Sequence, residues 1–228
     1  PYHFRGDKYK VRDKISFKIG PGEKICITGM PGASNTTLIH LAATLFHNYD
    51  GHITFNDITL KNLNLISLRS YVGENLAKKD LIQGTIAENI SMGRDDISYH
   101  DIKKATDTVG LTSFIQKTPE GFNTQIVPED ITISSNVVTK IAMARSIAEK
   151  PHLFLLDNFL LNLKQEDQDL IIDALVGKDK FWTLLGASNN QSFAKKCDRI
   201  FVLQDGKLID QGNYEHVSKQ PYFEGLFR

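Results

Sequence analysis

Cysteine and net charge are scarce in this 228-residue sequence, which also has no long hydrophobic run. The two cysteines, Cys26 and Cys197, have no metal-ligand spacing and favour a reduced, cytosolic setting. The 27 Lys and Arg balance the 27 Asp and Glu, so the long-range field of a dedicated nucleic-acid binder is missing and no nucleic-acid partner is predicted. The apolar run Leu153–Leu156 is far shorter than the roughly 20 residues that cross a bilayer. We therefore expect a chain that does not itself span a membrane.

The start and the length of the chain bear on its organisation. It begins at Pro1, without a methionine and without the charged and apolar segments of a secretory signal. We expect a piece of a longer protein rather than a secreted one. Its length suits one large α/β domain or two small ones with a genuine core, and it has no internal repeat.

Strand and helix patterns alternate in the first part of the chain. Ile15–Ile19 and Lys24–Thr28 are predicted as strands, and a helical pattern follows the glycine-rich segment Gly29–Ser34. Two short strands joined by Asn56-Asp57 predict a hairpin. From about residue 86 to 149 the pattern becomes helical, which indicates a helical insertion.

The later part of the chain has stronger signals. Ser98 and Asp101 predict a capping box for a helix that ends at Gly110. Strands that alternate with helices imply a mainly parallel sheet. The further elements predicted are helix Asn136–Glu149, strand Leu153–Leu156, helix Gln165–Leu175, strand Trp182–Leu185, helix Gln191–Lys196, and strands Ile200–Gln204 and Lys207–Asp210.

The segment from Gly29 to Thr37 lies between a predicted strand and a predicted helix, where a phosphate-binding loop belongs. Against the template G-x-x-x-x-G-K-[ST], Gly29 and Thr36 match. Ser34 stands at the second glycine and Asn35 at the lysine. Taken alone, the segment is more simply interpreted as a tight strand-to-helix turn.

Other segments change that interpretation. Asp157 ends an apolar strand, which is typical of a carboxylate that holds Mg²⁺, although such an aspartate is also a common turn former. Gly84–Ile90 and Pro119–Thr124 lie between the loop and this strand, and Cys197–Gly212 follows them. With these motifs in this order, the sequence from about Phe4 to its end resembles the nucleotide-binding domain of exporter-type ABC transporters.

The resemblance implies a fold and an assembly. The fold would be the P-loop NTPase fold of the ABC ATPase type, an α/β fold with a mainly parallel sheet, an antiparallel β edge and an inserted helical subdomain. We expect one domain over residues 1–228, with a core at about 1–80 and 147–228 and the helical subdomain at about 81–146. The domain would form the C-terminal part of a longer chain with a membrane domain. It would bind a transmembrane domain at the cytoplasmic face of a membrane, pair with an identical or different nucleotide-binding domain, and use Mg-ATP.

The resemblance also assigns functional positions, and many of them carry unusual residues. The lysine of the phosphate loop falls on Asn35, the catalytic glutamate on Asn158, the switch histidine on Asn189 and the Q-loop glutamine on Ala77. The other assigned positions are Phe4, Gly29, Gly32, Ala33, Ser34, Thr36 and Thr37 for nucleotide, Thr36 and Asp157 for Mg²⁺, Ile133, Ser134, Ser135, Asn136 and Val137 for the signature, and residues 161–164 for the D-loop.

These replacements weaken binding and chemistry. Asn35 lacks an ammonium group, whose charge-assisted hydrogen bond contributes about 1.5–3 kcal/mol. Asn158 cannot accept a proton, which costs about 10²–10⁴ in rate, and Asn189 cannot carry positive charge. We expect no intact catalytic residue, weak or absent ATP binding, and a structural or coupling role. Two alternatives stay open: an ATPase that uses other residues, for which Lys24 lies on the wrong side of the strand, and a sensor that binds ATP without hydrolysing it.

Overall fold

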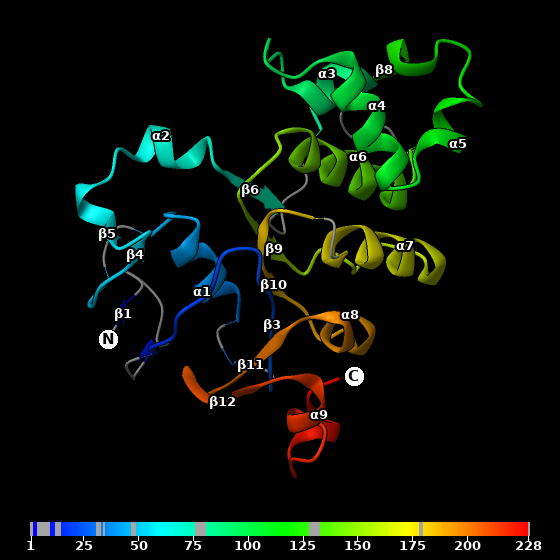
Figure 1. Cartoon of the computed structure of the whole chain (residues 1–228). Coiled ribbons are helices and arrows are strands. Elements are labelled where there is room, and N and C mark those ends of the chain that lie inside the picture. The colour runs from blue at the N-terminus through cyan, green and yellow to red at the C-terminus, as the bar shows by residue number, and fades with distance from the viewer. Residues whose placement is uncertain are drawn as a thin grey trace.

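The protein is described by a computed structural model that covers residues 2–3, 10–11, 15–30, 33, 35–46, 49–75, 81–127, 133–177 and 180–227. Its centre is a six-stranded sheet (Figure 1). Neighbouring strands run parallel, except that the edge strand β12 is antiparallel to β11. This is the predicted α/β fold with an antiparallel edge. The strand order is β12 (Lys207–Gly212), β11 (Arg199–Gln204), β3 (Lys24–Gly29), β10 (Thr183–Ala187), β9 (Leu153–Asp157) and β6 (Val72–Asn75).

The burial of the strands explains their order. All six residues of β3 are buried, and β9 and β10 are buried except at their first residues. Strands covered on both faces have nearly continuous apolar sequences, and these three lie side by side inside the sheet. β12 alternates between exposed and half-buried residues, as an edge strand does. Because β3, β9 and β10 run parallel, their carboxyl ends lie together at the same end of the sheet.

Helices cover both faces of the sheet (Figure 1). On one face, Ile39 of α1 (Asn35–Ala42) belongs to the apolar cluster that includes Ile27 and Phe201. On the other face, α7 (Gln165–Val176) and α8 (Gln191–Lys196) contribute Ile172 and Phe193 to a larger cluster. Successive residues of β3 alternate between the two clusters, which confirms that they lie on opposite faces.

Four further helices gather beside the sheet, beyond β6 and β9 (Figure 1). Two of them begin with capping boxes, Thr85 with Glu88 and Ser98 with the predicted Asp101. Their apolar side chains belong to the same cluster as those of α7 and β9, so the boundaries of a helical subdomain at 81–146 stay a prediction. These helices are α3 (Ile86–Ser91), α4 (Tyr99–Thr108), α5 (Thr112–Ile115) and α6 (Ser135–Ala148).

Short elements complete the described chain. The predicted hairpin is confirmed: Asn56 and Asp57 join its strands with φ angles of 48° and 63°. The short elements are β1 (Tyr2–His3), β2 (Lys10–Val11), β4 (Thr54–Phe55), β5 (Ile58–Thr59), α2 (Leu65–Arg69), β7 (Gly84–Thr85), β8 (Gln125–Ile126) and α9 (Tyr214–Val217).

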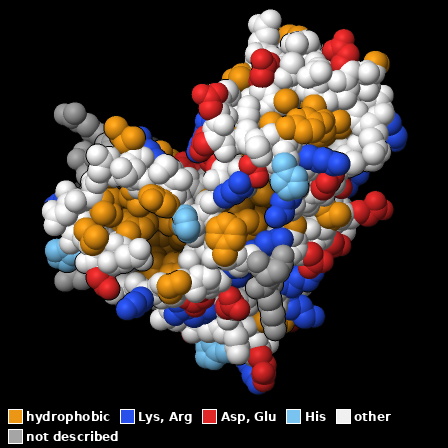
Figure 2. Space-filling model, turned by 45° about the horizontal axis from the view of Figure 1, so that its top comes forward, with side chains coloured by type: hydrophobic (Ala, Val, Ile, Leu, Met, Phe, Trp, Pro, Cys, Tyr) orange, Lys and Arg blue, Asp and Glu red, His pale blue; other side chains and the backbone are white. Residues whose placement is uncertain are grey.

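Figure 2 shows acidic and basic side chains interspersed over the face that it displays, without an extended area of one sign.

One predicted strand is wrong. Residues 15–19 form no strand, and their alternation has another cause. Ile15, Phe17 and Ile19 pack on the apolar cluster of β3 and α1, with the Phe17 ring centroid 4.8 Å from that of Phe201. An extended segment lying on a sheet face has the same two-residue period as a strand within the sheet.

In the described parts of the chain, we find no helix that combines the length and the apolar character needed to cross a membrane.

Candidate functional site

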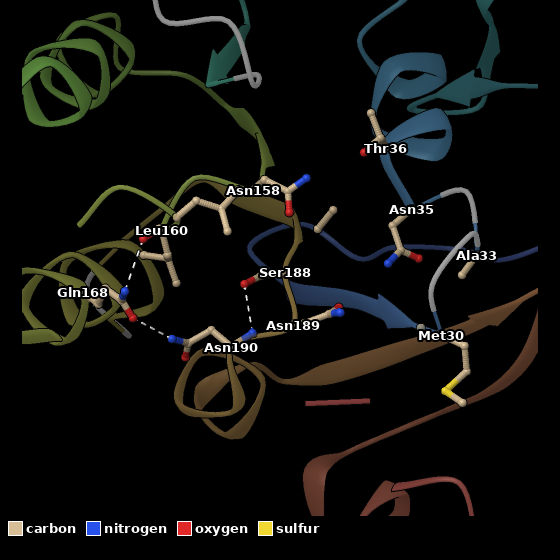
Figure 3. Close-up of a pocket in the computed structure, with 13 residues that line it drawn as sticks. Met30, Ala33, Asn35, Thr36, Asn158, Leu160, Gln168, Ser188, Asn189 and Asn190 are labelled. Atoms are coloured by element: carbon tan, nitrogen blue, oxygen red, sulfur yellow. Dashed lines mark hydrogen bonds between the residues drawn. The ribbon is translucent and has the colours of Figure 1, made fainter. Parts of the chain in front are cut away.

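A cavity of about 610 Å³ lies where β3, β9 and β10 end (Figure 3). Five carboxamide side chains line it, and none of the described lining residues carries a charge. The residues that follow these three neighbouring parallel strands lie side by side at the cavity. The first turn of α1 forms the wall opposite α7. The lining residues are Gly29, Met30, Ala33, Asn35, Thr36, Asn158, Leu160, Leu161, Gln168, Ala187, Ser188, Asn189 and Asn190.

Asp157 forms the centre of a small polar group beside the cavity. Its Oδ1 atom accepts hydrogen bonds from Thr36 Oγ1 at 3.0 Å and from Asn158 Nδ2 at 3.1 Å. Its Oδ2 atom is buried and has no partner within the described structure. Burial raises the pKa of the Asp157 carboxyl, and the hydrogen bond from Thr36 partly offsets that rise. The structure thus brings together the two residues predicted for Mg²⁺, with a carboxylate oxygen and a hydroxyl of the types that bind this ion.

Asn35, Asn158 and Asn189 surround the cavity from three directions (Figure 3). Asn35 is the first residue of α1, and its Oδ1 atom is buried without a partner among the described residues. Asn189 Oδ1 accepts a hydrogen bond from Thr28 Oγ1 at 3.0 Å. Amides offer donors and acceptors but no charge. The three positions that the resemblance assigns to a lysine, a glutamate and a histidine are therefore gathered at one site and are all neutral.

The wall formed by α7 and α8 was not predicted from the sequence. Asn190 Nδ2 donates to Gln168 Oε1 at 2.9 Å, and Asn190 N donates to Ser188 Oγ at 3.1 Å. Gln168 Nε2 donates to the carbonyl oxygens of Leu160 and Leu163 at 3.2 and 3.1 Å (Figure 3). The available signal for Asn190 was its place just before a helix, where it caps α8.

Lys24 cannot supply the missing cation. Its Nζ atom donates to the carbonyl oxygens of Gly22, Lys180 and Trp182 at 2.8, 3.1 and 2.6 Å. The side chain lies at the start of β3, whereas the cavity opens at Gly29 at the strand's end. Five steps of about 3.3 Å separate these residues, or roughly 17 Å.

Gly29 is explained by packing. A Cβ atom at this position would lie 2.2 Å from the carbonyl oxygen of Leu203 in β11 and 2.7 Å from Ala33 Cβ. The backbone of β11 thus requires glycine here whether or not a phosphate binds. This part of the loop motif has a structural reason.

The signature positions lie at the start of α6 and do not line the cavity. Ser134 caps the helix by accepting a hydrogen bond from Val137 N at 3.4 Å. Ile133 and Val137 pack against the larger apolar cluster, and Ser135 is exposed. Asn136 turns to α7, where its Nδ2 atom donates to Asp167 Oδ2 at 2.9 Å. Within one chain, the structure does not bring the signature positions and the cavity together.

The remaining predicted positions are placed differently. Ala33 lines the cavity, whereas Thr37 lies in α1 and is not among the lining residues. The predictions for Phe4, Gly32, Ser34 and Ala77 fall outside the described residues.

Comparisons with known proteins point to one family. A family model described as ABC transporter matches residues 12–160. An uncharacterized ABC transporter ATP-binding protein, YknV of Bacillus subtilis (strain 168), is 30% identical over 223 residues, which are 97% of this chain and 37% of the relative. An ATP-dependent lipid A-core flippase of Pseudomonas fluorescens (strain Pf0-1) is 27% identical over 222 residues, covering 96% of this chain and 37% of that protein.

A solved structure shares the fold. A bacterial Atm1-family ABC exporter with ATP bound superposes with a TM-score of 0.88 and 23% identity, covering 97% of this chain and 40% of that chain. The chain therefore spans well under half the length of the relatives that it matches.

Proposed function

This chain belongs to the ABC transporter family, and from that premise we propose that it is an exporter-type ATP-binding domain that has lost ATP hydrolysis. In this proposal it binds ATP weakly or not at all and acts as a structural or coupling module of a membrane exporter. It lies at the cytoplasmic face of the membrane as part of a longer chain or complex. Its helical subdomain, at about 81–146, binds a transmembrane domain. A second nucleotide-binding domain, identical or different, is its partner.

The observation that carries the proposal is the lack of charge in the cavity. Asn35, Asn158 and Asn189 stand where the resemblance assigns a lysine, a glutamate and a histidine, and no described lining residue is charged. A triphosphate carries several negative charges, and moving them out of water without a compensating cation is costly. Asn35 cannot bind phosphate through a positive charge, and Asn158 cannot take a proton from the attacking water. Asn189 cannot stabilise the charge that develops on the phosphoryl group.

The residues fit Mg-ATP only in part. Thr36 and Asp157 present a hydroxyl and a carboxylate with one unpartnered oxygen, which suits a divalent cation. None of the described residues that line the cavity offers a cationic side chain to the triphosphate that the ion would accompany. The site therefore does not fit the complete cofactor, and in this proposal the chain carries out no hydrolytic step.

The amides serve the fold instead. Asn158 donates to Asp157, and Asn189 accepts from Thr28, so two of the three replaced positions are bonded within the protein. Asn190 and Gln168 tie α8, α7 and the loop after β9 together. These bonds hold the strand ends in place without a ligand, which supports a structural role.

The two alternatives make different demands. An ATPase with other residues needs a replacement cation, and Lys24 is bonded to three carbonyl oxygens at the far end of β3. A sensor needs measurable ATP affinity without turnover. ATP binding distinguishes the sensor from a structural module. Release of phosphate distinguishes the ATPase from both.

The test of the proposal is phosphate release in the presence of Mg-ATP. We expect the rate of the native chain to equal that of its Thr36→Ala and Asp157→Asn variants, because no catalytic turnover is present to lose. Circular dichroism spectra of all three proteins check that they are folded. A native turnover that either substitution abolishes would show that the chain is an active ATPase.

A further inference from the structure

A polar network joins the start of α6 to α7. Asp167, in the first turn of α7, accepts hydrogen bonds from Asn136 Nδ2 at 2.9 Å and from Lys140 Nζ at 2.5 Å. Lys140 also donates to the carbonyl oxygen of Gly110, just beyond α4, at 3.2 Å. Asn136 Oδ1 accepts from Lys164 N at 3.4 Å. The carboxylate thus joins α6 to α7, and Lys140 extends the network to Gly110.

The network is partly shielded from water. The Lys140 side chain is 8% exposed and that of Asp167 is 22% exposed. Burial raises the pKa of Asp167, but the hydrogen bonds from Lys140 and Asn136 lower it, and the resulting pKa lies below the ordinary value. A shielded lysine needs a carboxylate nearby, and that carboxylate needs donors for both oxygens. Asn136 is the described donor to Oδ2.

The residue at position 136 decides whether this network is complete. The signature pattern of the family that the chain resembles is L-S-G-G-Q, which falls on residues 133–137 and places a glycine at 136. A glycine has no side chain with which to make either bond. The Asn136 side chain donates to Asp167 in α7 and accepts from Lys164 N, and Lys164 is the residue just before α7. The departure from the signature pattern therefore adds two contacts between α6 and α7.

We propose that Asn136, Asp167 and Lys140 form a latch that holds α6 on α7 and so fixes the helices α3 to α6 against the sheet with no ligand present. Figure 1 shows α7 beside the sheet, α6 next to α7, and α3, α4 and α5 beyond α6. α6 is the element of that group that reaches α7 through the latch, and it shares an apolar cluster with α3 and α4.

The latch also holds the loop that borders the cavity. The segment between β9 and α7 is bonded at its start by Asn158 to Asp157 and at its end by Lys164 N to Asn136. Gln168, next to Asp167, binds two carbonyl oxygens within the segment. Two neighbouring residues of α7 thus have separate tasks: Asp167 holds α6, and Gln168 holds the segment that forms the cavity wall.

Hydrogen–deuterium exchange on the full chain, without nucleotide, tests the latch with two adjacent substitutions. Asn136→Gly removes the two bonds, and Ser135→Gly is its matched control because Ser135 is exposed and also lies in the first turn of α6. Helix propensity alone predicts about a 2-fold rise in exchange for either change. Loss of a charge-assisted hydrogen bond predicts about a 10-fold rise or more.

We expect Asn136→Gly to raise exchange about 10-fold at the first hydrogen-bonded amides of α6 and α7, which begin at Val138 and Gln168, and at the Lys164 amide. Ser135→Gly should stay near 2-fold and be confined to α6. In an Asp167→Ala background, the effect of Asn136→Gly on the α6 and α7 amides should fall to about 2-fold, because the bond to Asp167 is already gone. The effect at the Lys164 amide should remain, since that amide donates to Asn136 itself. If Asp167→Ala does not fold, the comparison of the two glycine variants still decides.

Equal effects of Asn136→Gly and Ser135→Gly would overturn the latch. So would an undiminished effect of Asn136→Gly on the α6 and α7 amides in the Asp167→Ala background. The experiment contains no nucleotide, so its failure leaves the proposed loss of hydrolysis untouched. Conversely, a chain that hydrolyses ATP could still contain the latch.

Discussion

Asn35→Lys returns a cation to the cavity and tests whether its absence limits ATP binding. Asn35 begins α1 and lines the cavity, and its Oδ1 atom has no partner among the described residues. The substitution therefore removes no described bond of that oxygen. The cavity of about 610 Å³ leaves room for a longer side chain.

The expected gain follows from one charge-assisted contact. A hydrogen bond from an ammonium to a phosphate oxygen contributes about 1.5–3 kcal/mol, which is about 10- to 150-fold in affinity. If the native chain has a dissociation constant for Mg-ATP on the order of 10 mM, the variant should reach about 0.07–1 mM by the same arithmetic. Turnover should stay absent, because Asn158 still lacks a carboxylate.

Isothermal titration calorimetry with Mg-ATP measures the change. Asn62→Lys is the matched control, since it adds the same charge at an exposed position outside the cavity. We expect tighter binding only in the Asn35 variant, and a weakening of that gain at high salt. An affinity within about 3-fold of the native chain, or an equal gain in the control, would refute the view that a missing cation in this cavity limits binding.

Three further substitutions test the structural account. Lys24→Met should cost about 1–3 kcal/mol in urea unfolding, because three carbonyl oxygens lose their donor, and it should leave the response to Mg-ATP unchanged. Gly29→Ala should lower stability by at least about 1–3 kcal/mol, since its methyl group would collide with the Leu203 backbone, and an unchanged unfolding midpoint would contradict that packing. Asp101→Ala should cost about 1 kcal/mol at pH 7. Hydrogen bonds from Lys150 and the helix cap lower the pKa of Asp101 to about 2, so its contribution is complete above pH 4 and lost as the pH falls through about 2. Acid titration of both proteins should show their stabilities converging there.

Local signals in the sequence predict much of this fold. Ser98 and Asp101 make both bonds of the predicted capping box, and Asn56-Asp57 form the predicted hairpin turn. Helix Gln191–Lys196 has the predicted bounds. In each case the deciding interactions join residues close together in the chain, so the sequence pattern contains them.

Longer-range contacts are where prediction from the sequence ends. The segment 15–19 alternates like a strand, but only the packed structure shows that its apolar residues lie on a sheet face. Gln168 and Asn190 meet in the cavity wall although 22 residues separate them. Asn136 and Asp167 are 31 residues apart. No periodicity or cap signal reports such pairs, because the fold alone brings them together.

The capping box at Thr85 and Glu88 is a different case. Both residues show the local pattern that predicts the start of α3, and both bonds are present. The spacing of a threonine and a glutamate three residues apart is itself a sequence signal of a helix start. The described site thus combines positions that a family resemblance can name with partners that only the folded chain supplies.

Thermal unfolding of the native chain with and without 5 mM Mg-ATP tests the central claim most directly, where about 5 mM is about 100 times a dissociation constant of about 50 µM. Binding of that strength would add about 2.7 kcal/mol of stability and raise Tm by about 5–10 °C in a chain of this size. The uncharged cavity predicts a shift below about 1 °C. A rise of about 5 °C or more would contradict the account, because it would show that the chain holds ATP without the cation that its site lacks.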